Sequence, residues 1–515
     1  MVHDEMVFLR PDVRTEPLVN GFRAWAHLLA PHTYARNLVA RHVPRMREVL
    51  HDAQARADAS GAGDAREWLD AVIGQSPHLI ELGAAITQLD TLMLSQTGGQ
   101  DLEPLYAQVP EPLRGRVELV YNRYNQPGVR FLEAILYRGP YYDPGLQAVR
   151  LERVDPDEPD EGLAVPRMPK AGRMIRPARF DSGIWNLIGQ ARRAPVRASE
   201  LADGLGVDVE ELAPFLTTEP PHPHPLTTRA RDGAVFLNHA CVLFESPRSS
   251  VLIDPLVAYR RDGATDRMSF ADLPDQITCL AITHAHLDHL DIETLLQIRH
   301  LVDRVVVPRT NAGDLLDPSL ALVLSAIGFE DVVELDDYTT LSLPDGSITA
   351  LPFLGEHSDL TVRGKAGYAV TLNNSTSVLV ADSRCLEQRV YEVAREQLGP
   401  IDSLFIGMEC EGSPMTMASG PYLPTGQYTE QMSQARRTKG SDAAGGMELV
   451  HALGPRQVYV YAMGLEPWLS YMFGVSDPTR SYSLAQTEAF ITECAALGLP
   501  AELLRGSQTL DVRQR

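Results

Sequence analysis

An α/β fold is predicted, in which sheets covered by helices follow a mainly helical, mixed α/β N-terminal domain. The chain has 515 residues, too many for a single hydrophobic core, so two or three domains are expected. Its first 150 residues carry mainly helical periodicity, whereas short β-rich runs alternate with helices after a proline-rich stretch near residue 220. Alternation of this kind builds sheets with a helical cover, and ligands collect where the strands end.

The N-terminal domain is expected to end at a proline-rich linker. Before it, apolar residues recur three and four positions apart through residues 66–96, as in amphipathic helices. Successive prolines in EPPHPHPL, residues 219–226, disfavour helix and sheet pairing, so His222 and His224 are interpreted as solvated linker residues. The predicted domains are therefore residues 1–225 and 226–515.

Composition excludes several classes of protein. The formal net charge of −22 argues against nucleic acid or an anionic membrane as a partner. No apolar run is long enough to cross a membrane, and the first residues lack the basic and then apolar order of a signal peptide. The five cysteines are scattered without CxxC spacing and are expected to be reduced thiols. A cytoplasmic enzyme is predicted.

Strands of the second domain are predicted where short apolar runs are bounded by turn residues. The runs are AVFLNHACVLFES (234–246), SSVLIDPL (249–256), ITCLAIT (277–283), RVVVPR (304–309), SITALPFL (347–354), GYAVTLNN (367–374), SVLVADS (377–383), SLFIGME (403–409) and RQVYVYAMG (456–464). A helix is predicted at IETLLQIRHLV, residues 292–302. Further helices around the later strands would cover the sheets.

The segment ITHAHLDHLD, residues 282–291, places three histidines and a carboxylate within six positions. His284 and His286 can point the same way from an extended backbone, whereas Asp288 and His289 would turn towards a second ion about 3.5 to 4 Å away. Without a cation, these groups would repel one another or remain half-desolvated. The segment therefore predicts a metal centre, and leaves open which metal it holds.

This pattern resembles the signature of the metallo-β-lactamase fold, an αββα sandwich, over about residues 228–515. The resemblance implies that Asp254 in LIDP orients a ligating histidine rather than binding metal itself. Asp382 in VLVADS matches the carboxylate that bridges two metals in the family. Most hydrolases of this fold also use one histidine between the motif and the bridging aspartate, and another near the C-terminus.

The sequence departs from the hydrolases at both of these histidines. Glu356 and His357 are adjacent in PFLGEHSDL, and the end of a strand can direct only one of two neighbours towards a metal. Near the C-terminus, His451 lies in a predicted helix and is unsuitable as a ligand. Glu409, at the end of SLFIGME, is available instead, with Glu411 as an alternative.

Charge then favours iron over zinc. The predicted ligands are three histidines and four carboxylates: His284, His286, Asp288, His289, Glu356, Asp382 and Glu409. Two zinc ions would just neutralise the four carboxylates. Two ferric ions would leave positive charge, which an oxo or hydroxo bridge would balance. Carboxylate-rich dinuclear sites suit iron and manganese, so two Fe ions in a diiron cluster are the predicted cofactor.

This ligand set resembles that of the diiron β-hydroxylases of chloramphenicol biosynthesis and of nonribosomal peptide pathways, over nearly the whole chain. The resemblance implies that one iron is held by His284, His286, Glu356 and Asp382, and the other by Asp288, His289, Glu409 and bridging Asp382, with Glu356, Asp382 and Glu409 as catalytic carboxylates. It also implies β-hydroxylation of an aminoacyl thioester on the phosphopantetheine of a peptidyl carrier domain, with O2 and an external electron donor. A homodimer is implied by the same resemblance.

Three other functions are weighed against this one. A binuclear zinc hydrolase of an ester, lactone or thioester is the main alternative, and the missing terminal histidine weighs against it. A flavodiiron reductase would carry a flavin domain after the metal domain. A non-enzymatic scaffold would not need the full ligand set.

A few residues keep two interpretations. His239 either lines the site or is structural. The aromatic residues Trp468, Tyr471 and Phe473 form either a substrate wall or ordinary core, and Arg436, Arg437 and Lys439 form either a solvated helix face or a docking patch.

Overall fold

Two seven-stranded sheets form the C-terminal half of the chain, in a computed structural model that describes residues 5–55, 59–96, 98–159, 161–168, 170–228, 233–473 and 481–512. The first sheet has the order β15 (Val332–Leu335), β14 (Val305–Pro308), β13 (Cys279–Ala281), β12 (Ser250–Ile253), β11 (Cys241–Glu245), β10 (Gly233–Asn238) and β25 (Gln508–Leu510). The second has the order β16 (Thr340–Leu343), β17 (Gly346–Leu351), β18 (Gly367–Leu372), β19 (Ser375–Leu379), β20 (Ser403–Gly407), β23 (Gln457–Tyr461) and β24 (Ala501–Leu503). All the predicted strands are present.

Aromatic and aliphatic side chains fill the space between the two sheets. Phe236 and Ile253 of the first sheet and Tyr368 of the second are buried there. The rings of Phe244 and Phe405 meet across the interface with centroids 5.8 Å apart. Because both sheets contribute large apolar groups, this layer forms the core of the sandwich.

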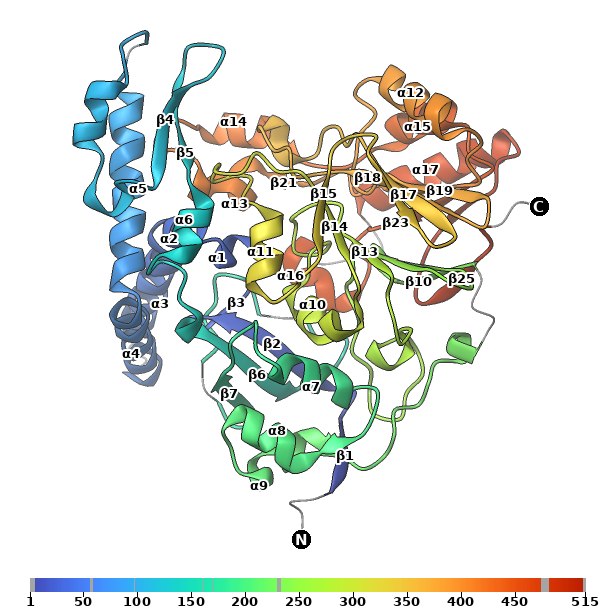
Figure 1. Ribbon diagram of the computed structural model, residues 1–515, viewed down its shortest axis with the longest axis horizontal. Coiled ribbons are helices and arrows are strands. Elements are labelled where there is room, and N and C mark those ends of the chain that lie inside the picture. The colour runs from blue at the N-terminus through green and yellow to red at the C-terminus, as the bar shows by residue number, and fades with distance from the viewer. Residues whose placement is uncertain are drawn as a thin grey trace.

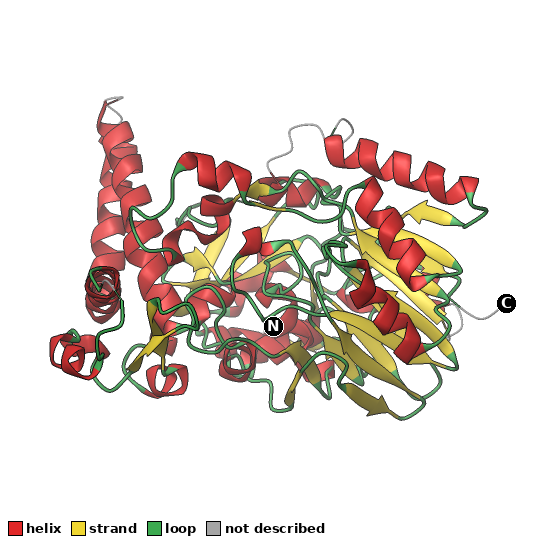
Figure 2. Ribbon diagram, turned by 90° about the horizontal axis from the view of Figure 1, so that it is seen from above, coloured by secondary structure: helices red, strands yellow, loops and turns green. Residues whose placement is uncertain are grey.

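Helices cover the outer faces of both sheets. They are α10 (Ile292–Ile298) and α11 (Leu320–Ala326) on the first sheet, and α12 (Gln388–Leu398), α15 (Ala443–Leu453) and α17 (Tyr482–Ala496) on the second (Figure 1; Figure 2). Shorter elements lie in the loops: α13 (Met415–Ser419), α14 (Glu430–Ala435), α16 (Ser470–Phe473), β21 (Ser413–Pro414) and β22 (Arg437–Thr438). The four layers form the predicted αββα sandwich.

The N-terminal part combines helices with small sheets. After α1 (Ala26–Leu29), a helical arm contains α2 (Pro31–Asn37), α3 (Val43–Ala55), α4 (Ala59–Gln75) and α5 (Pro77–Leu94), drawn in blue in Figure 1. An antiparallel sheet has the order β3 (Phe22–Arg23), β2 (Val13–Val19), β6 (Gln147–Arg153) and β7 (Arg173–Pro177). A hairpin consists of β4 (Val117–Tyr121) and β5 (Pro127–Phe131), and a small sheet has the order β8 (Val196–Arg197), β1 (Met6–Leu9) and β9 (Leu216–Thr217). The remaining α-helices of this part are α6 (Glu133–Arg138), α7 (Ile184–Ala191), α8 (Ala198–Leu205) and α9 (Val209–Leu212). None of the helices in the described part of the chain is both long and apolar enough to span a lipid bilayer.

The expectation that the first 150 residues are mainly helical holds for the arm and is wrong for the strands around it. Strand β2 is buried along its whole length, so its sequence VRTEPLV lacks the alternation of a half-buried strand. Its acidic residue pairs inside the domain instead, since Glu16 contacts Arg167 at 2.8 Å and Arg150 at 2.9 Å. Fully buried charge pairs of this kind obscure the period that identifies a strand.

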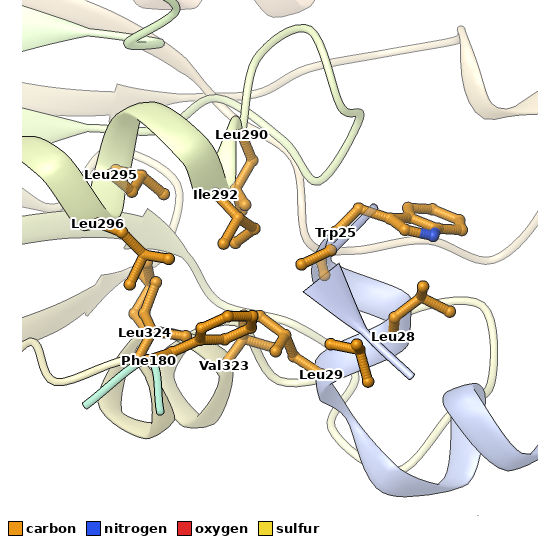
Figure 3. Close-up of a cluster of buried hydrophobic side chains, with 14 of the residues drawn as sticks. Trp25, Leu28, Leu29, Phe180, Leu290, Ile292, Leu295, Leu296, Val323 and Leu324 are labelled. Carbon is orange, nitrogen blue, oxygen red and sulfur yellow. The ribbon is translucent and has the colours of Figure 1, made fainter. Parts of the chain in front are cut away.

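The N-terminal part packs directly against the helix that follows the metal-binding motif. Gly189 of α7 lies so close to α10 that a Cβ atom there would be 1.8 Å from the carbonyl oxygen of Gln297. Figure 3 shows Leu290 and Ile292 beside α1, in a buried cluster that also contains Trp25. The N-terminal part therefore supports the motif from one side.

The predicted linker is only partly solvated. His222 is exposed, as expected, but His224 is buried, with 9% of its surface exposed. The His224 N–H donates to Asp272 Oδ1 at 2.6 Å, and its Nδ1 accepts from the Leu226 N–H at 3.2 Å. The prediction for His224 is wrong because the carboxylate of Asp272 anchors this stretch to the sandwich.

Candidate metal centre

The motif loop, residues 282–291, connects β13 to α10. The N–H groups of His289 and Leu290 donate to the carbonyl oxygen of His286 at 3.1 and 2.8 Å, which closes a turn. As a result, the rings of His284 and His289 lie 4.2 Å apart and are fully buried, whereas His286 is half-buried. The loop therefore presents one half-buried and two enclosed imidazoles.

Three overlapping groups of possible ligand atoms surround this loop. They are His284, His286 and Glu356; His284, His289 and Asp382; and His239, Asp288 and His289, each within 4.8 Å. Oδ2 of Asp382 lies 3.2 Å from His289 Nε2 and 3.7 Å from His284 Nε2. His286 Nδ1 lies 3.4 Å from Glu356 Oε1. Asp382 thus stands between two clusters of donors, where a bridging carboxylate is expected.

The donor atoms of this centre fit a cation. His284 Nε2, His289 Nε2 and Asp382 Oδ1 are buried and find no hydrogen-bond partner in the part of the chain that the structure describes. Burial and the neighbouring histidines hold the pKa of His284 well below its ordinary value, so this ring is neutral. Burial opposes protonation of His289, but the surrounding carboxylates, Asp288 first among them, raise its pKa well above the ordinary value. A metal ion in place of protons would satisfy all of these groups, and the carboxylate-rich set suits iron.

Asp254 positions the motif from behind. Its Oδ2 accepts hydrogen bonds from His289 Nδ1 at 2.8 Å and from the Thr283 hydroxyl at 2.7 Å, and its Oδ1 accepts from the Thr283 N–H at 2.7 Å. Because Nδ1 of His289 is occupied, its Nε2 faces the centre. The geometry agrees with the prediction that Asp254 orients a histidine.

Glu356 and His357 lie in a left-handed turn and not at the end of a strand. Strand β17 ends at Leu351, and φ is 73° at Gly355, 58° at Glu356 and 54° at Ser358. The alternation of side chains along a strand therefore does not separate the two residues. That reasoning was wrong, because a short turn of positive φ brings both side chains to the centre.

The two side chains differ in charge. The His357 ring stacks on His286 with centroids 4.6 Å apart, and Glu356 Oε2 accepts from the His357 N–H at 2.6 Å. Burial alone would raise the pKa of Glu356, but His286 and His357 lower it to about 2, while burial lowers the pKa of His357 to about 4. Glu356 is therefore an anion facing the centre, beside a neutral imidazole.

Glu409 follows β20, as predicted, close to the bridging position. Its Oε2 accepts from the Gly412 N–H at 2.9 Å and its Oε1 from the Ser483 hydroxyl at 3.1 Å. Burial, with Asp382 nearby, raises its pKa. Gly407 makes room for this arrangement, because a Cβ atom there would be 2.5 Å from Asp382 Oδ1. Glu409 is not among the three groups above, and each of its oxygens accepts one hydrogen bond.

His239 and Glu466 extend the centre beyond the predicted ligands. His239 Nε2 lies 2.9 Å from Asp288 Oδ2, and the His239 N–H donates to Glu466 Oε1 at 2.6 Å. Burial opposes protonation of His239, but its bonds to Asp288 and Glu466 raise its pKa to about 9. It is thus a cationic partner of Asp288. Sequence reasoning left His239 open and missed Glu466, whose only signal is its place after β23.

Strands of both sheets end at the centre in strained turns. His239, Asp254, Ala381 and Ala462 have φ of 47°, 43°, 47° and 54°, and follow β10, β12, β19 and β23. Non-glycine residues in this region cost on the order of 1 to 3 kcal/mol each, and such strain concentrates at functional sites.

The arginines considered as a docking patch are engaged with the backbone. Arg436 donates to the Ser358 carbonyl oxygen at 3.0 Å, and Arg437 donates to those of Glu411 and Gly412 at 2.9 and 2.6 Å. They fasten the loop after Glu409 rather than presenting a free cationic surface.

The remaining predicted features are the aromatic residues after Glu466, and His451. Trp468 is half-buried, with the guanidinium of Arg267 over its ring at 4.5 Å. The side chains of Tyr471 and Phe473 lie outside the described residues. His451 is exposed on α15, as the sequence suggested.

The fold and the centre together define a metalloprotein with a metallo-β-lactamase sandwich. Residues 249–461 match the Beta-lactamase superfamily domain, and residues 8–220 match the Diiron non-heme beta-hydroxylase N-terminal domain. The chain is 34% identical to the 4-amino-L-phenylalanyl-[CmlP-peptidyl-carrier-protein] 3-hydroxylase of Streptomyces venezuelae, over 98% of this chain and 99% of the relative.

Solved structures agree with this similarity. The crystal structure of CmlA, a diiron beta-hydroxylase from Streptomyces venezuelae, superposes with a TM-score of 0.90 at 32% identity, over 98% of this chain and 99% of CmlA. A mutant of CmlA gives a TM-score of 0.88 at 32% identity over the same shares. The chain belongs to the family of diiron non-heme β-hydroxylases. The predicted fold, enzyme class and diiron cofactor are confirmed, whereas the assignment of individual ligands stays a prediction.

Proposed function

We propose that the enzyme β-hydroxylates an aminoacyl group held as a thioester on a peptidyl carrier domain of a nonribosomal peptide synthetase. The proposal is supported by similarity over the full length to a hydroxylase whose name places its substrate on a peptidyl carrier protein. One oxygen atom of O2 enters the C–H bond of the β-carbon. The other leaves as water with two protons and two electrons from an external donor.

We infer that two clusters of donors each hold one iron. The first would use His284, His286, Glu356 and Asp382, and the second Asp288, His289, Glu409 and Asp382 as the shared ligand. The observation that carries this assignment is the position of Asp382 Oδ2, within 3.7 Å of imidazole nitrogens of His284 and His289. Glu356, Asp382 and Glu409 are then the carboxylates that contact the reacting centre.

The residues of the chain hold, orient and shield this centre. When bound, the iron pair supplies the activation of O2. Burial of His284 and His289 excludes water from the ligands. Asp254 keeps a proton on Nδ1 of His289, and His239 donates to Asp288, so both ligands present a fixed atom to the metal. The chemistry requires no side chain to act as a base.

The charge of the protein favours a tethered substrate. The chain carries a formal net charge of −22, and its centre is lined with carboxylates. A free amino acid would bring a further carboxylate to this site, whereas a thioester removes that charge and adds a long handle. Tethering also raises the effective concentration of the substrate.

A single-turnover experiment tests the form of the substrate. Chemically reduced enzyme is mixed with O2 and either a free amino acid or the same amino acid loaded on its carrier. We expect β-hydroxylation of the loaded form only. Equal rates for the two forms would contradict the tethered substrate and leave the diiron centre in place.

Three organisational features complete the proposal. We place the domain boundary at residues 225 and 226, after the matched N-terminal family domain. The N-terminal domain would form a homodimer and shape the docking surface for the carrier. The five cysteines, all free thiols, support a reducing cytoplasmic location.

A further inference from the structure

Lys365 contacts two of the segments that surround the metal centre. Its backbone forms an isolated antiparallel bridge with His284, and the Ala366 N–H beside it donates to the Thr283 carbonyl oxygen at 2.8 Å. Its ammonium donates to the carbonyl oxygen of Gly355 at 2.7 Å. One residue therefore contacts the metal-binding motif through its backbone and the turn of positive φ through its side chain.

The turn of positive φ, residues 354–358, is a strained segment. Gly355, Glu356 and Ser358 have φ of 73°, 58° and 54°. Non-glycine residues in this conformation persist only where the surrounding structure holds them. The turn therefore depends on contacts from outside it.

The two ends of the turn are held by neighbouring segments. At its start, the Leu354 N–H donates to the Ser383 hydroxyl at 3.1 Å. At its end, Arg436 donates to the Ser358 carbonyl oxygen at 3.0 Å. The ammonium of Lys365 acts between these two contacts, on the first residue of positive φ. The conformation that directs a carboxylate to the centre thus begins at the residue that Lys365 binds.

The side chain of Lys365 is itself held in place. Its ammonium lies over the ring of Phe353, 5.5 Å from the centroid, as in a cation–π contact. Phe353 is buried and meets the His284 ring edge-on, with centroids 5.4 Å apart. The Gly364 N–H, one residue before Lys365, donates to Asp317 Oδ1 at 3.1 Å. The position of the ammonium is therefore defined from both the motif and the backbone beside it.

We infer that Lys365 is a positioning residue, which holds the turn of positive φ against the motif and thereby places the Glu356 carboxylate beside His286. This inference rests on the proposed assignment of Glu356 as an iron ligand. The ammonium donates to a carbonyl oxygen rather than to the carboxylate, so Glu356 stays available to a cation. Residues that orient metal ligands without contacting the metal contribute to metal affinity in this way.

The test compares Lys365→Met, Lys365→Arg and the control Lys170→Met with the wild type. Methionine keeps most of the length of the side chain but has no donor, whereas arginine keeps the charge and the N–H donors. Lys170 is exposed and pairs with Glu152 at 2.7 Å in the N-terminal part. Hydrogen–deuterium exchange is measured on the metal-free proteins, and iron affinity is measured by competition with a chelator.

In the metal-free protein, we expect Lys365→Met to exchange about 10-fold or more faster over residues 352–360, because the turn loses a charged hydrogen bond. Exchange in the rest of the sandwich should match the wild type. Iron affinity should fall by about 10- to 100-fold. Lys365→Arg should recover part of both properties, and Lys170→Met should match the wild type.

Several results would overturn the inference. They are unchanged exchange over residues 352–360 in Lys365→Met, exchange raised equally through the whole sandwich, and no recovery in Lys365→Arg. Failure of the proposed ligand set is distinguished by Glu356→Ala. Two irons retained in that variant would show that Glu356 is not a ligand, whereas the local exchange in Lys365→Met would still decide whether Lys365 holds the turn. Wild-type iron affinity in Lys365→Met, with iron lost in Glu356→Ala, would also overturn the inference.

Discussion

The two sides of the metal centre are built by different means. On the motif side, His284 and His289 come from one loop, and Asp254 with Thr283 fixes that loop by four short contacts between 2.7 and 3.0 Å. On the glutamate side, Glu356 depends on a backbone turn of positive φ. The motif side shows that side-chain networks leave a sequence signature, whereas the glutamate side shows that strained backbone leaves almost none.

Replacing the residue shared by the two sides should have the largest effect. Asp382→Ala removes the carboxylate between His284 and His289, and should cost most of the iron and on the order of 10³ or more in activity, because the ligands act as a unit. The surface variant Asp331→Ala, which breaks only an ion pair with Arg304, is the control. Retention of two irons in Asp382→Ala would contradict the assignment of Asp382 as the bridging ligand.

The glutamate side is tested by its two adjacent residues. Glu356→Ala should lose iron and hydroxylation, since it removes an anion that faces His286 at 3.4 Å. His357→Ala should keep the cluster, because a neutral imidazole that stacks on a ligand adds no charge to the centre. Metal analysis and single-turnover assays measure both. Loss of iron in His357→Ala, with iron retained in Glu356→Ala, would indicate that His357 is the ligand, as a histidine is in the hydrolases of this fold.

Asp254 supports the motif side, and its replacement should reduce iron binding less than the loss of a ligand does. Asp254→Asn leaves the ligand atoms in place but weakens the bond that orients His289. We expect iron affinity to fall by about 10- to 100-fold, measured by competition with a chelator. Wild-type affinity in this variant would show that the backbone alone holds the loop.

Asp317 supports the glutamate side, and its replacement should change the pH dependence of stability with the smallest effect on the ligands themselves. It accepts hydrogen bonds from the N–H groups of Asn311, Arg363 and Gly364, next to Lys365, whose ammonium donates to the turn. Burial raises its pKa to about 6, so its contribution to stability is present below the ordinary pKa near 4 and is lost as the pH rises through 6.

Asp317→Asn should therefore flatten the pH dependence of unfolding between about pH 4 and 6, by at most about 3 kcal/mol. Denaturant unfolding at a series of pH values measures this for the wild type and the variant. An unchanged slope between these pH values would show that Asp317 does not titrate in this range.

Most of the fold and of the motif could be predicted from the sequence, because both rest on local patterns. The predicted strand run at residues 277–283 and the loop from His284 to His289 are contiguous, so their chemistry is visible in a few residues. The position of Asp254 could be predicted only through the family pattern.

Other parts of the site could not be predicted, because they depend on distant contacts or on backbone conformation. The turn at Glu356 is set by φ values that its sequence does not specify, and the strand rule failed there. Glu466 is paired with His239 across 227 residues.

Metal content and Mössbauer spectra of protein expressed with isotopically enriched iron test the central claim most directly. The account predicts about two irons per chain in a coupled pair, whose spectrum changes when substrate loaded on the carrier is added to the reduced enzyme under O2. Two tightly bound zinc ions, with full activity on an ester or thioester and none with iron, would contradict it.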